Sequence, residues 1–485
     1  MTRSSSRWAR TKQFPGRVQG AYSEWKLAGL LLVVALIFGG GGSPAPLQEA
    51  LVQLAALSVL TFLIAKGRAR FFERVAEDPW LWSAVALAAA VPLIQLVPLP
   101  PAVWTALPGR ELQSQSLGLL VQGDTWRPLS LFPLRTLSSF LSLLPPLVML
   151  FLVAGMNMPD KVRMLGAIWV AALASAVLGV AQLSGGDFFY PYVTAHVGYA
   201  TGFFASRNAQ ADLLAIGVVA AAGWFVASRE LGAPRPAAVV VALALFLAIA
   251  VITTGSRSGM AMLVVAGAAA FLILAAPRWP WWKIAAAPGA AGLLAALFYS
   301  NPVVQRSLAR FDNSQDLRPF VWEDTVFAAS HYFPAGSGMG TFVPVFRLYE
   351  RLEIVNRSYV NRAHNDFLEL LLEGGILSLL VLLCFALFML VRAGSAILAR
   401  QEPVRSFGWC AAFSWLLLGL HSVVDYPLRN QLIMVVAALL LGLTAKTHRS
   451  EPPGRRRSDA PGVGSGESSA RGTRKAARSG VGETD

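Results

Sequence analysis

The residues best suited to chemistry lie where a long apolar run begins in the C-terminal third of this 485-residue chain. Histidine can take up a proton near neutral pH, so a single histidine beside acids is a candidate general base. If a helix opens at the histidine, acids spaced three and four residues apart share one face of it. The alternative is a histidine that only caps the helix. The residues are His364 as the candidate base and Asn365, Asp366, Glu369 and Glu373 in support.

Three arginines are candidates for holding a phosphate-bearing substrate. Arg257 lies in Thr-Thr-Gly-Ser-Arg-Ser-Gly, a very short turn between two apolar runs, and its guanidinium fork matches phosphate oxygens. Arg207 lies where a loop enters another apolar run, and Ser206 or Asn208 could cap that helix, whose N-terminus favours an anion. Arg318, in a long loop, is a third candidate. The alternative is that these arginines only anchor helix ends at the membrane surface.

A further polar turn, His421 to Asn430, separates the last two apolar runs. It contains Asp425 and Arg429, four residues apart. We expect these two side chains to pair across the turn and to shape the wall of a pocket.

The composition excludes a soluble enzyme and a nucleic-acid-binding module. The chain is 55% hydrophobic and 14% charged, whereas soluble domains have roughly 25% charged residues. Apolar runs long enough to cross a ~30 Å hydrocarbon core recur along it, and backbone in lipid must be helical or closed into a barrel. We predict an all-α, polytopic transmembrane bundle of about twelve spans. The predicted spans are 25–42, 47–65, 79–97, 134–156, 162–183, 208–228, 237–254, 259–276, 282–299, 364–391, 405–424 and 430–446.

Basic residues predict the orientation of these spans. The short loops on one side carry about twice as many Lys and Arg as those on the other, so both termini are placed in the cytoplasm. Three external segments are long, 98–133, 184–207 and 300–363. The last is rich in aromatic residues, which predicts a partly helical lid on the membrane surface. Because the candidate residues all fall at external helix ends, we expect one shared pocket.

The predicted domains are a basic cytoplasmic tail, 1–24, a transmembrane catalytic domain, 25–446, and a disordered basic tail, 447–485. Much of the net charge of +14 lies in the two tails, which membrane topology explains better than binding to nucleic acid, and the C-terminal tail could contact membrane lipids. The two cysteines lie in apolar runs and no metal-binding spacing occurs, so we expect no cofactor and no metal.

Taken together, these segments resemble the O-antigen ligase and polymerase superfamily of bacterial envelope enzymes. The resemblance covers residues from about 200 to 430 and depends on the order and spacing of motifs that are individually weak. The matching segments are Gly202-Phe203-Phe204 with Arg207-Asn208, Gly255 to Gly259, Arg318 to Trp322, Gly336 to Phe342, Ala363 to Leu368 with Glu373 to Gly375, and His421 to Arg429.

The resemblance implies a GT-C-like, metal-independent glycosyltransferase in the bacterial inner membrane, with its active site on the periplasmic side. It implies a donor glycan carried on undecaprenyl diphosphate and an acceptor glycolipid, either lipid A core or another carrier-linked repeat. It also implies roles for Arg207 and Arg257 at the donor diphosphate, for His364 as the base, and less directly for Arg318.

Three interpretations compete. An O-antigen ligase and an O-antigen or exopolysaccharide polymerase would share this fold, and the motifs do not separate them. A multi-pass transporter or flippase would have charged residues in the middle of several spans, often with broken helices. A non-catalytic membrane scaffold would tolerate substitution of His364 and Arg257.

Overall fold

The computed structural model describes residues 24–42, 45–67, 71–185, 189–233, 236–275, 317–355, 359–399 and 401–446. Four predicted segments lie outside these residues. They are the N-terminal tail except Glu24, the tail 447–485, the ninth span 282–299 and the first part of the long loop.

Helices make up nearly all the regular structure of the described residues, with one short antiparallel strand pair in which Pro98 faces Pro128. The elements are α1 (Glu24–Phe38), α2 (Pro46–Ala65), α3 (Phe71–Glu77), α4 (Pro79–Gln95), β1 (Pro98–Leu99), α5 (Pro101–Trp104), α6 (Glu111–Leu119), β2 (Arg127–Pro128), α7 (Pro133–Leu141), α8 (Leu144–Ala154), α9 (Met158–Gly185), α10 (Arg207–Glu230), α11 (Ala237–Thr253), α12 (Arg257–Ala275), α15 (Arg318–Tyr332), α16 (Phe342–Phe346), η2 (Leu352–Ile354), α17 (Asp366–Ile397), α18 (Val404–His421), η3 (Pro427–Arg429) and α19 (Gln431–Leu443).

Each predicted span within the described residues coincides with helix, and six helical stretches there are long and apolar enough to cross a membrane. Three shorter apolar helices, α4, α11 and α19, accompany them. The helical membrane architecture is therefore confirmed, while the number of spans stays a prediction. The fourth predicted span is not one regular helix, because α7 ends before Ser142 and α8 begins at Leu144. Pro145 and Pro146 follow at once, and proline lacks the N–H that would continue a preceding helix.

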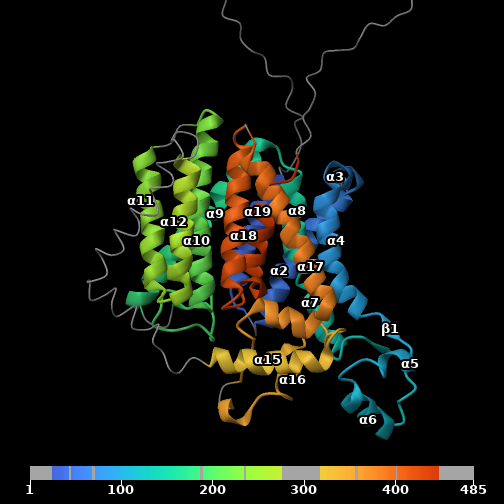
Figure 1. Cartoon of the computed structure of the whole chain (residues 1–485). Coiled ribbons are helices and arrows are strands. Elements are labelled where there is room, and N and C mark those ends of the chain that lie inside the picture. The colour runs from blue at the N-terminus through green and yellow to red at the C-terminus, as the bar shows by residue number, and fades with distance from the viewer. Residues whose placement is uncertain are drawn as a thin grey trace, which may run out of the picture. The chain divides into compact units, whose positions relative to one another are not determined.

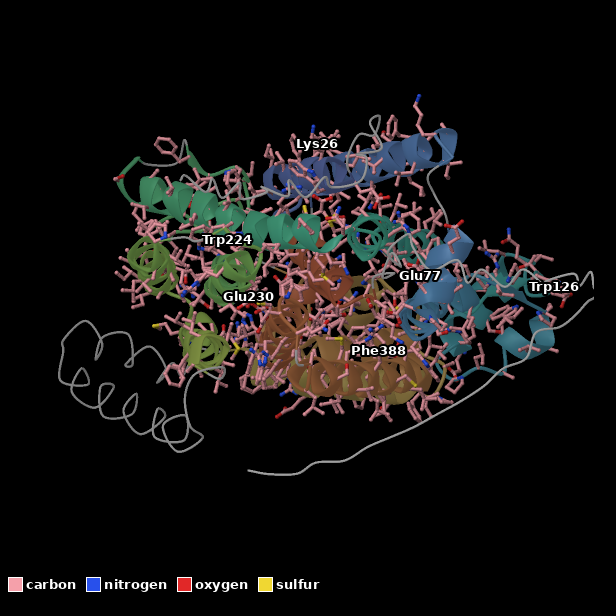
Figure 2. The ribbon with its side chains drawn as sticks, turned by 90° about the horizontal axis from the view of Figure 1, so that it is seen from above. Lys26, Glu77, Trp126, Trp224, Glu230 and Phe388 are labelled. Carbon is pink, nitrogen blue, oxygen red and sulfur yellow. The ribbon has the colours of Figure 1, made fainter. Side chains whose placement is uncertain are left out.

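Helix α10 is the most deeply buried of the long apolar helices in the described part of the chain. Nearly all of its residues are buried, and it packs against α9, α11, α12 and α18 (Figure 1). On α9, Trp169 stacks on Trp224 with ring centroids 5.1 Å apart (Figure 2). On α12, a Cβ added to Gly259 would lie 2.4 Å from the Cβ of Ala211, so the glycine lets α12 approach α10 closely. This contact places Arg257, the first residue of α12, beside the first turns of α10.

Two of the long segments between predicted spans, 98–133 and the described part of 300–363, lie at one end of the upright helices. In Figure 1, α15 lies across the lower end, and α5, α6 and β1 lie at the same end. Trp126, just before β2, lies to the side of the helices (Figure 2). The expected partly helical character of the long loop is confirmed for its described part, which contains α15, α16 and η2.

Helix α17 is interrupted at Gly375, whose backbone has φ 56° and ψ −146°. This break removes intrahelical partners from two carbonyls. Leu372 O accepts a hydrogen bond from Ser337 N at 3.0 Å, and Glu373 O accepts one from Gly338 N at 2.8 Å. The loop after α15 therefore supplies the hydrogen bonds that the helix lacks. The break is one feature expected of a transporter, but here loop backbone fills it.

Substituting Gly336 by alanine tests this junction. Gly336 has φ 80°, and a Cβ there would lie 2.6 Å from Glu373 O. We expect a loss of about 2 kcal/mol or more, of which about 1 kcal/mol comes from the left-handed backbone alone. Gly232→Ala is the control, because Gly232 has φ 75° with open space around its Cβ position. Melting temperatures in detergent should fall further for G336A than for G232A, and equal shifts would contradict the close packing.

Candidate active site

His364 lies immediately before a helix, in a strained backbone conformation. The predicted span 364–391 coincides with helix, and the helix starts two residues after His364. Helix α17 begins at Asp366, and Asn365 caps it by accepting hydrogen bonds from two backbone N–H groups. His364 itself has φ 51°, which is uncommon for a residue other than glycine. The preceding carbonyl, Ala363 O, accepts a hydrogen bond from Trp322 Nε1 at 3.0 Å, so α15 helps to fix this conformation. Strained backbone of this kind concentrates at functional sites.

The imidazole of His364 pairs with Asp425. His364 Nδ1 lies 3.1 Å from Asp425 Oδ1, and the histidine side chain is 31% exposed while that of Asp425 is 8% exposed. Burial raises the pKa of Asp425, but the hydrogen bond from His364 and the charges of His364, His421 and Arg318 more than offset this and hold that pKa at about 2. The ionised carboxylate favours the tautomer that donates Nδ1–H, which leaves Nε2 free to accept a proton.

Asn208 connects this pair to the arginine-bearing segments. Asn208 Nδ2 donates to Asp425 Oδ2 at 2.5 Å, and Ser256 Oγ donates to Asn208 Oδ1 at 2.7 Å. Arg207 and Arg257 are the chain neighbours of Asn208 and Ser256. The structure thus brings together segments that are far apart in the sequence. The expected cap of α10 is also present, since Ser206 Oγ accepts from Asn208 N.

A second histidine–aspartate pair extends the network. His421 Nδ1 lies 2.6 Å from Asp212 Oδ1, and His421 Nε2 lies 2.8 Å from Ser258 Oγ. Sequence reasoning placed His421 in the pocket wall but missed Asp212 and Ser258. A signal for Asp212 was present, because it is the only acid in an otherwise uncharged apolar run and such residues are costly in lipid.

The surroundings of Arg207 are electropositive. Its guanidinium lies over the ring of Tyr199, 4.4 Å from the centroid, and its backbone N–H donates to His196 Nδ1 at 3.4 Å. Burial lowers the pKa of His196, and the positive charges of Arg207 and His364 lower it further. Arg318 begins α15, and its charge acts on Asp425. Arg207 and Arg318 thus bring positive charge to a site that also contains the ionised Asp425.

A cavity of about 450 Å³ opens onto the network, and we name it the histidine cavity. Carboxylate, imidazole and phenol groups line it, together with backbone of the loop after α1. A polar hollow lined by the aspartate that pairs with His364 can bind a polar substrate close to that histidine. The lining residues include Gly41, Thr194, His196, Ser206, Asp212, Asn361, Asp425, Tyr426 and Asn430.

Arg429 does not pair with Asp425, so that prediction is wrong. Arg429 Nη2 lies 3.0 Å from Glu373 Oε2 and 3.5 Å from Glu369 Oε1, and its Nε lies 3.6 Å from Asp366 Oδ1. Burial lowers the pKa of Arg429, but these three carboxylates outweigh it and raise that pKa. Three acids on one helix face attract the guanidinium more strongly than one Asp already bonded to His364.

The candidate residues therefore form two networks and not the single pocket that the sequence predicted. One contains His364, Asp425 and the segments of Arg207 and Arg257. The other joins Arg429 to the acidic face of α17, where Arg362 Nη1 also bonds Glu369 Oε1 at 2.7 Å.

One family of known proteins matches part of the chain. The profile of the O-antigen ligase family matches residues 242–383, a region that contains Arg257, Arg318 and His364 but not Arg207. Among curated proteins, none matches the chain. The apolar helices fit an integral membrane protein, and its segment 242–383 is similar to the O-antigen ligase family.

Proposed function

We propose that the protein transfers a glycan from undecaprenyl diphosphate to an acceptor hydroxyl on the periplasmic side of the bacterial inner membrane. The observation that carries the proposal is the network that joins the His364–Asp425 pair to the neighbours of Arg207 and Arg257. One base, joined by hydrogen bonds to two arginine-bearing segments, suits a reaction between a hydroxyl group and a diphosphate ester.

In the proposed reaction, His364 Nε2 takes the proton of the acceptor hydroxyl as its oxygen bonds to the anomeric carbon. The bond between that carbon and the diphosphate oxygen breaks, and its electron pair leaves with the diphosphate. Arg207 and Arg257, with Arg318, stabilise the growing negative charge in a partly dry site, where such stabilisation is strong. Attack from the face opposite the leaving group inverts the configuration of the sugar.

The proposal includes independence from metal ions, because guanidinium groups would stabilise the leaving diphosphate. In the part of the chain that the structure describes, no three His, Cys, Asp or Glu side chains are grouped to hold a metal ion. We expect transfer by the purified protein to be unchanged by EDTA. Activity that falls with EDTA and returns with Mg²⁺ or Mn²⁺ would contradict this prediction.

The deciding experiment incubates the purified protein with a carrier-linked repeat, with and without lipid A core. Transfer to lipid A core supports a ligase in lipopolysaccharide synthesis, which we propose. Lengthening of the carrier-linked repeat alone would support the polymerase of O-antigen or exopolysaccharide. Absence of both products would contradict glycan transfer and return attention to a transporter or flippase.

A further inference from the structure

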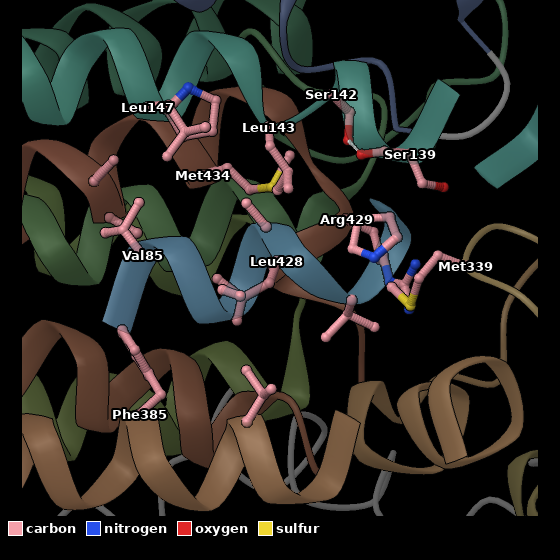
Figure 3. Close-up of a pocket in the computed structure, with 18 of the residues that line it drawn as sticks. Val85, Ser139, Ser142, Leu143, Leu147, Met339, Phe385, Leu428, Arg429 and Met434 are labelled. Carbon is pink, nitrogen blue, oxygen red and sulfur yellow. Dashed lines mark hydrogen bonds between the residues drawn. The ribbon is translucent and has the colours of Figure 1, made fainter. Parts of the chain in front are cut away.

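The segment that carries His364 and the turn that carries Asp425 lie between two cavities. Asp425 lines the histidine cavity, while Arg362 and Arg429 line a second cavity, of about 430 Å³. Figure 3 shows Arg429 toward one end of this second cavity, beyond hydrocarbon side chains that line the rest of it. A hollow offers no atoms to pack against. Polar contacts must therefore supply much of what fixes the segment and the turn relative to each other.

The side chain of Glu369, near the start of α17, bonds to both residues that precede His364. Glu369 Oε1 accepts a hydrogen bond from Arg362 Nη1 at 2.7 Å, and Glu369 Oε2 accepts one from Ala363 N at 3.2 Å. The carboxylate is fully buried, so water does not compete for these bonds. It reaches back from the helix to the chain before it, much as the acid of a capping box does. This contact fixes the backbone that enters His364, whose φ is 51°.

The same carboxylate reaches the turn that carries Asp425. Arg429, four residues after Asp425, places its Nη2 3.5 Å from Glu369 Oε1. At the other end of the turn, Ser422 O accepts a hydrogen bond from Asp366 N at 2.9 Å, and Ser422 Oγ donates to Asp366 Oδ2 at 3.0 Å. The turn is therefore bonded to the start of α17 on both sides of Asp425.

These contacts connect the acidic face of α17 to the candidate base. Resting on the proposed function, we propose that Glu369 is a positioning residue, which holds the segment of His364 and the turn of Asp425 in the arrangement that pairs their side chains. Glu369 lines neither of the two cavities. It therefore acts through His364 and not on a substrate.

Glu369→Gln weakens this contact, and Glu373→Gln is the matched control. A carboxylate offers two acceptor oxygens and an amide only one, so E369Q must lose one of the two bonds to the residues before His364. Glu373 is equally buried on the same helix face, but its Oε1 accepts from Phe342 N. We expect E369Q to lower kcat by about 10–10²-fold with little change in KM, because a misplacement of ~1 Å can cost that much. E373Q should lower kcat less, even where the two melting temperatures fall alike.

A double-mutant cycle with H364A is the first readout. If Glu369 acts through His364, E369Q should add almost nothing to the loss that H364A already causes. A loss by the same factor in the wild-type and H364A backgrounds would show that Glu369 only stabilises the fold. Equal values of kcat for E369Q and E373Q would contradict the proposal in the same way.

The tautomer of His364 is the second readout, and it needs no substrate. The chain has five histidines, so nitrogen NMR of the isotopically labelled full-length protein can follow each ring, and H364A identifies the signals of His364. In the wild type and E373Q, the neutral imidazole of His364 should carry its proton on Nδ1, as the bond to Asp425 requires. In E369Q we expect a mixture of tautomers.

Arg362→Gln is a second variant for the case that E369Q does not fold. It keeps the carboxylate of Glu369 and removes only one of its bonds, so it should show part of the same change in tautomer. An unchanged tautomer of His364 in E369Q and R362Q would overturn the proposal. Because this measurement is made without substrate, its result stands apart from any failure of glycan transfer.

Discussion

Replacing His364 with alanine should lower the rate of glycan transfer by about 10²–10⁴-fold, the usual contribution of a general base. The physical reason is the pairing of His364 Nδ1 with the ionised Asp425, which leaves Nε2 to accept the acceptor's proton. The measurement is initial rate in detergent or nanodiscs, normalised to protein abundance and melting temperature. Full activity in H364A would remove the general-base role.

Asp425→Asn tests how much of the rate depends on the orientation of His364 by Asp425, as distinct from proton transfer by His364 itself. An amide at residue 425 can still accept from His364 Nδ1–H but can also donate to it, so the useful tautomer is no longer enforced. We expect D425N to fall between the wild type and H364A in rate. Because the pKa of Asp425 is about 2, its carboxylate is ionised throughout a neutral assay range. Titration of Asp425 therefore does not contribute to the pH dependence of transfer in that range.

Arg257→Gln should lower transfer by about 10²–10³-fold, as expected for loss of one charged contact that acts in the transition state. Arg257→Lys should recover only part of this, because an ammonium lacks the planar fork that matches two phosphate oxygens. Rates for a series of donor concentrations separate kcat from KM.

Arg163→Gln is the matched control for R257Q. Arg163 is an exposed arginine on α9. It forms an ion pair with Asp160, which lies three residues earlier on the same helix. R163Q should change the transfer rate by less than twofold. Surface ion pairs contribute about 0–1 kcal/mol to stability, and this pair takes no part in the proposed reaction. Wild-type rates for R257K would indicate that Arg257 only anchors the end of α12 at the membrane surface.

Hydrophobic runs were enough to predict the helices, because the backbone N–H and C=O groups of a segment in lipid must form hydrogen bonds within that segment. The meeting of helix ends was also predictable, since each candidate lies beside a boundary of an apolar run. Which side chains pair with one another was not predictable from the sequence. His364 and Asp425 are 61 residues apart, and their contact depends on the turn after α18. Arg429 was assigned to the acid nearest in sequence, while in space it lies beside three others.

The break in helix α17 at Gly375 was equally unpredictable from the sequence. Gly374 and Gly375 stand out in the sequence, yet nothing in their spacing says that loop backbone replaces the missing helical bonds. Asp212 shows the opposite case, in which a single acid in an apolar run is a usable signal. Its partner His421 is 209 residues away, so the sequence indicates a buried charge without indicating what neutralises it.

The break in α17 has a mechanical consequence for how substrates arrive. The loop around Ser337 cannot leave α17 without removing both donors of Leu372 O and one of the two donors of Glu373 O, so we expect it to stay in place and not to open as a flap. Lipid-linked substrates have their chains in the bilayer already. We expect them to enter laterally between helices. A crosslink that fixes the loop around Ser337 to α17 should therefore leave turnover intact.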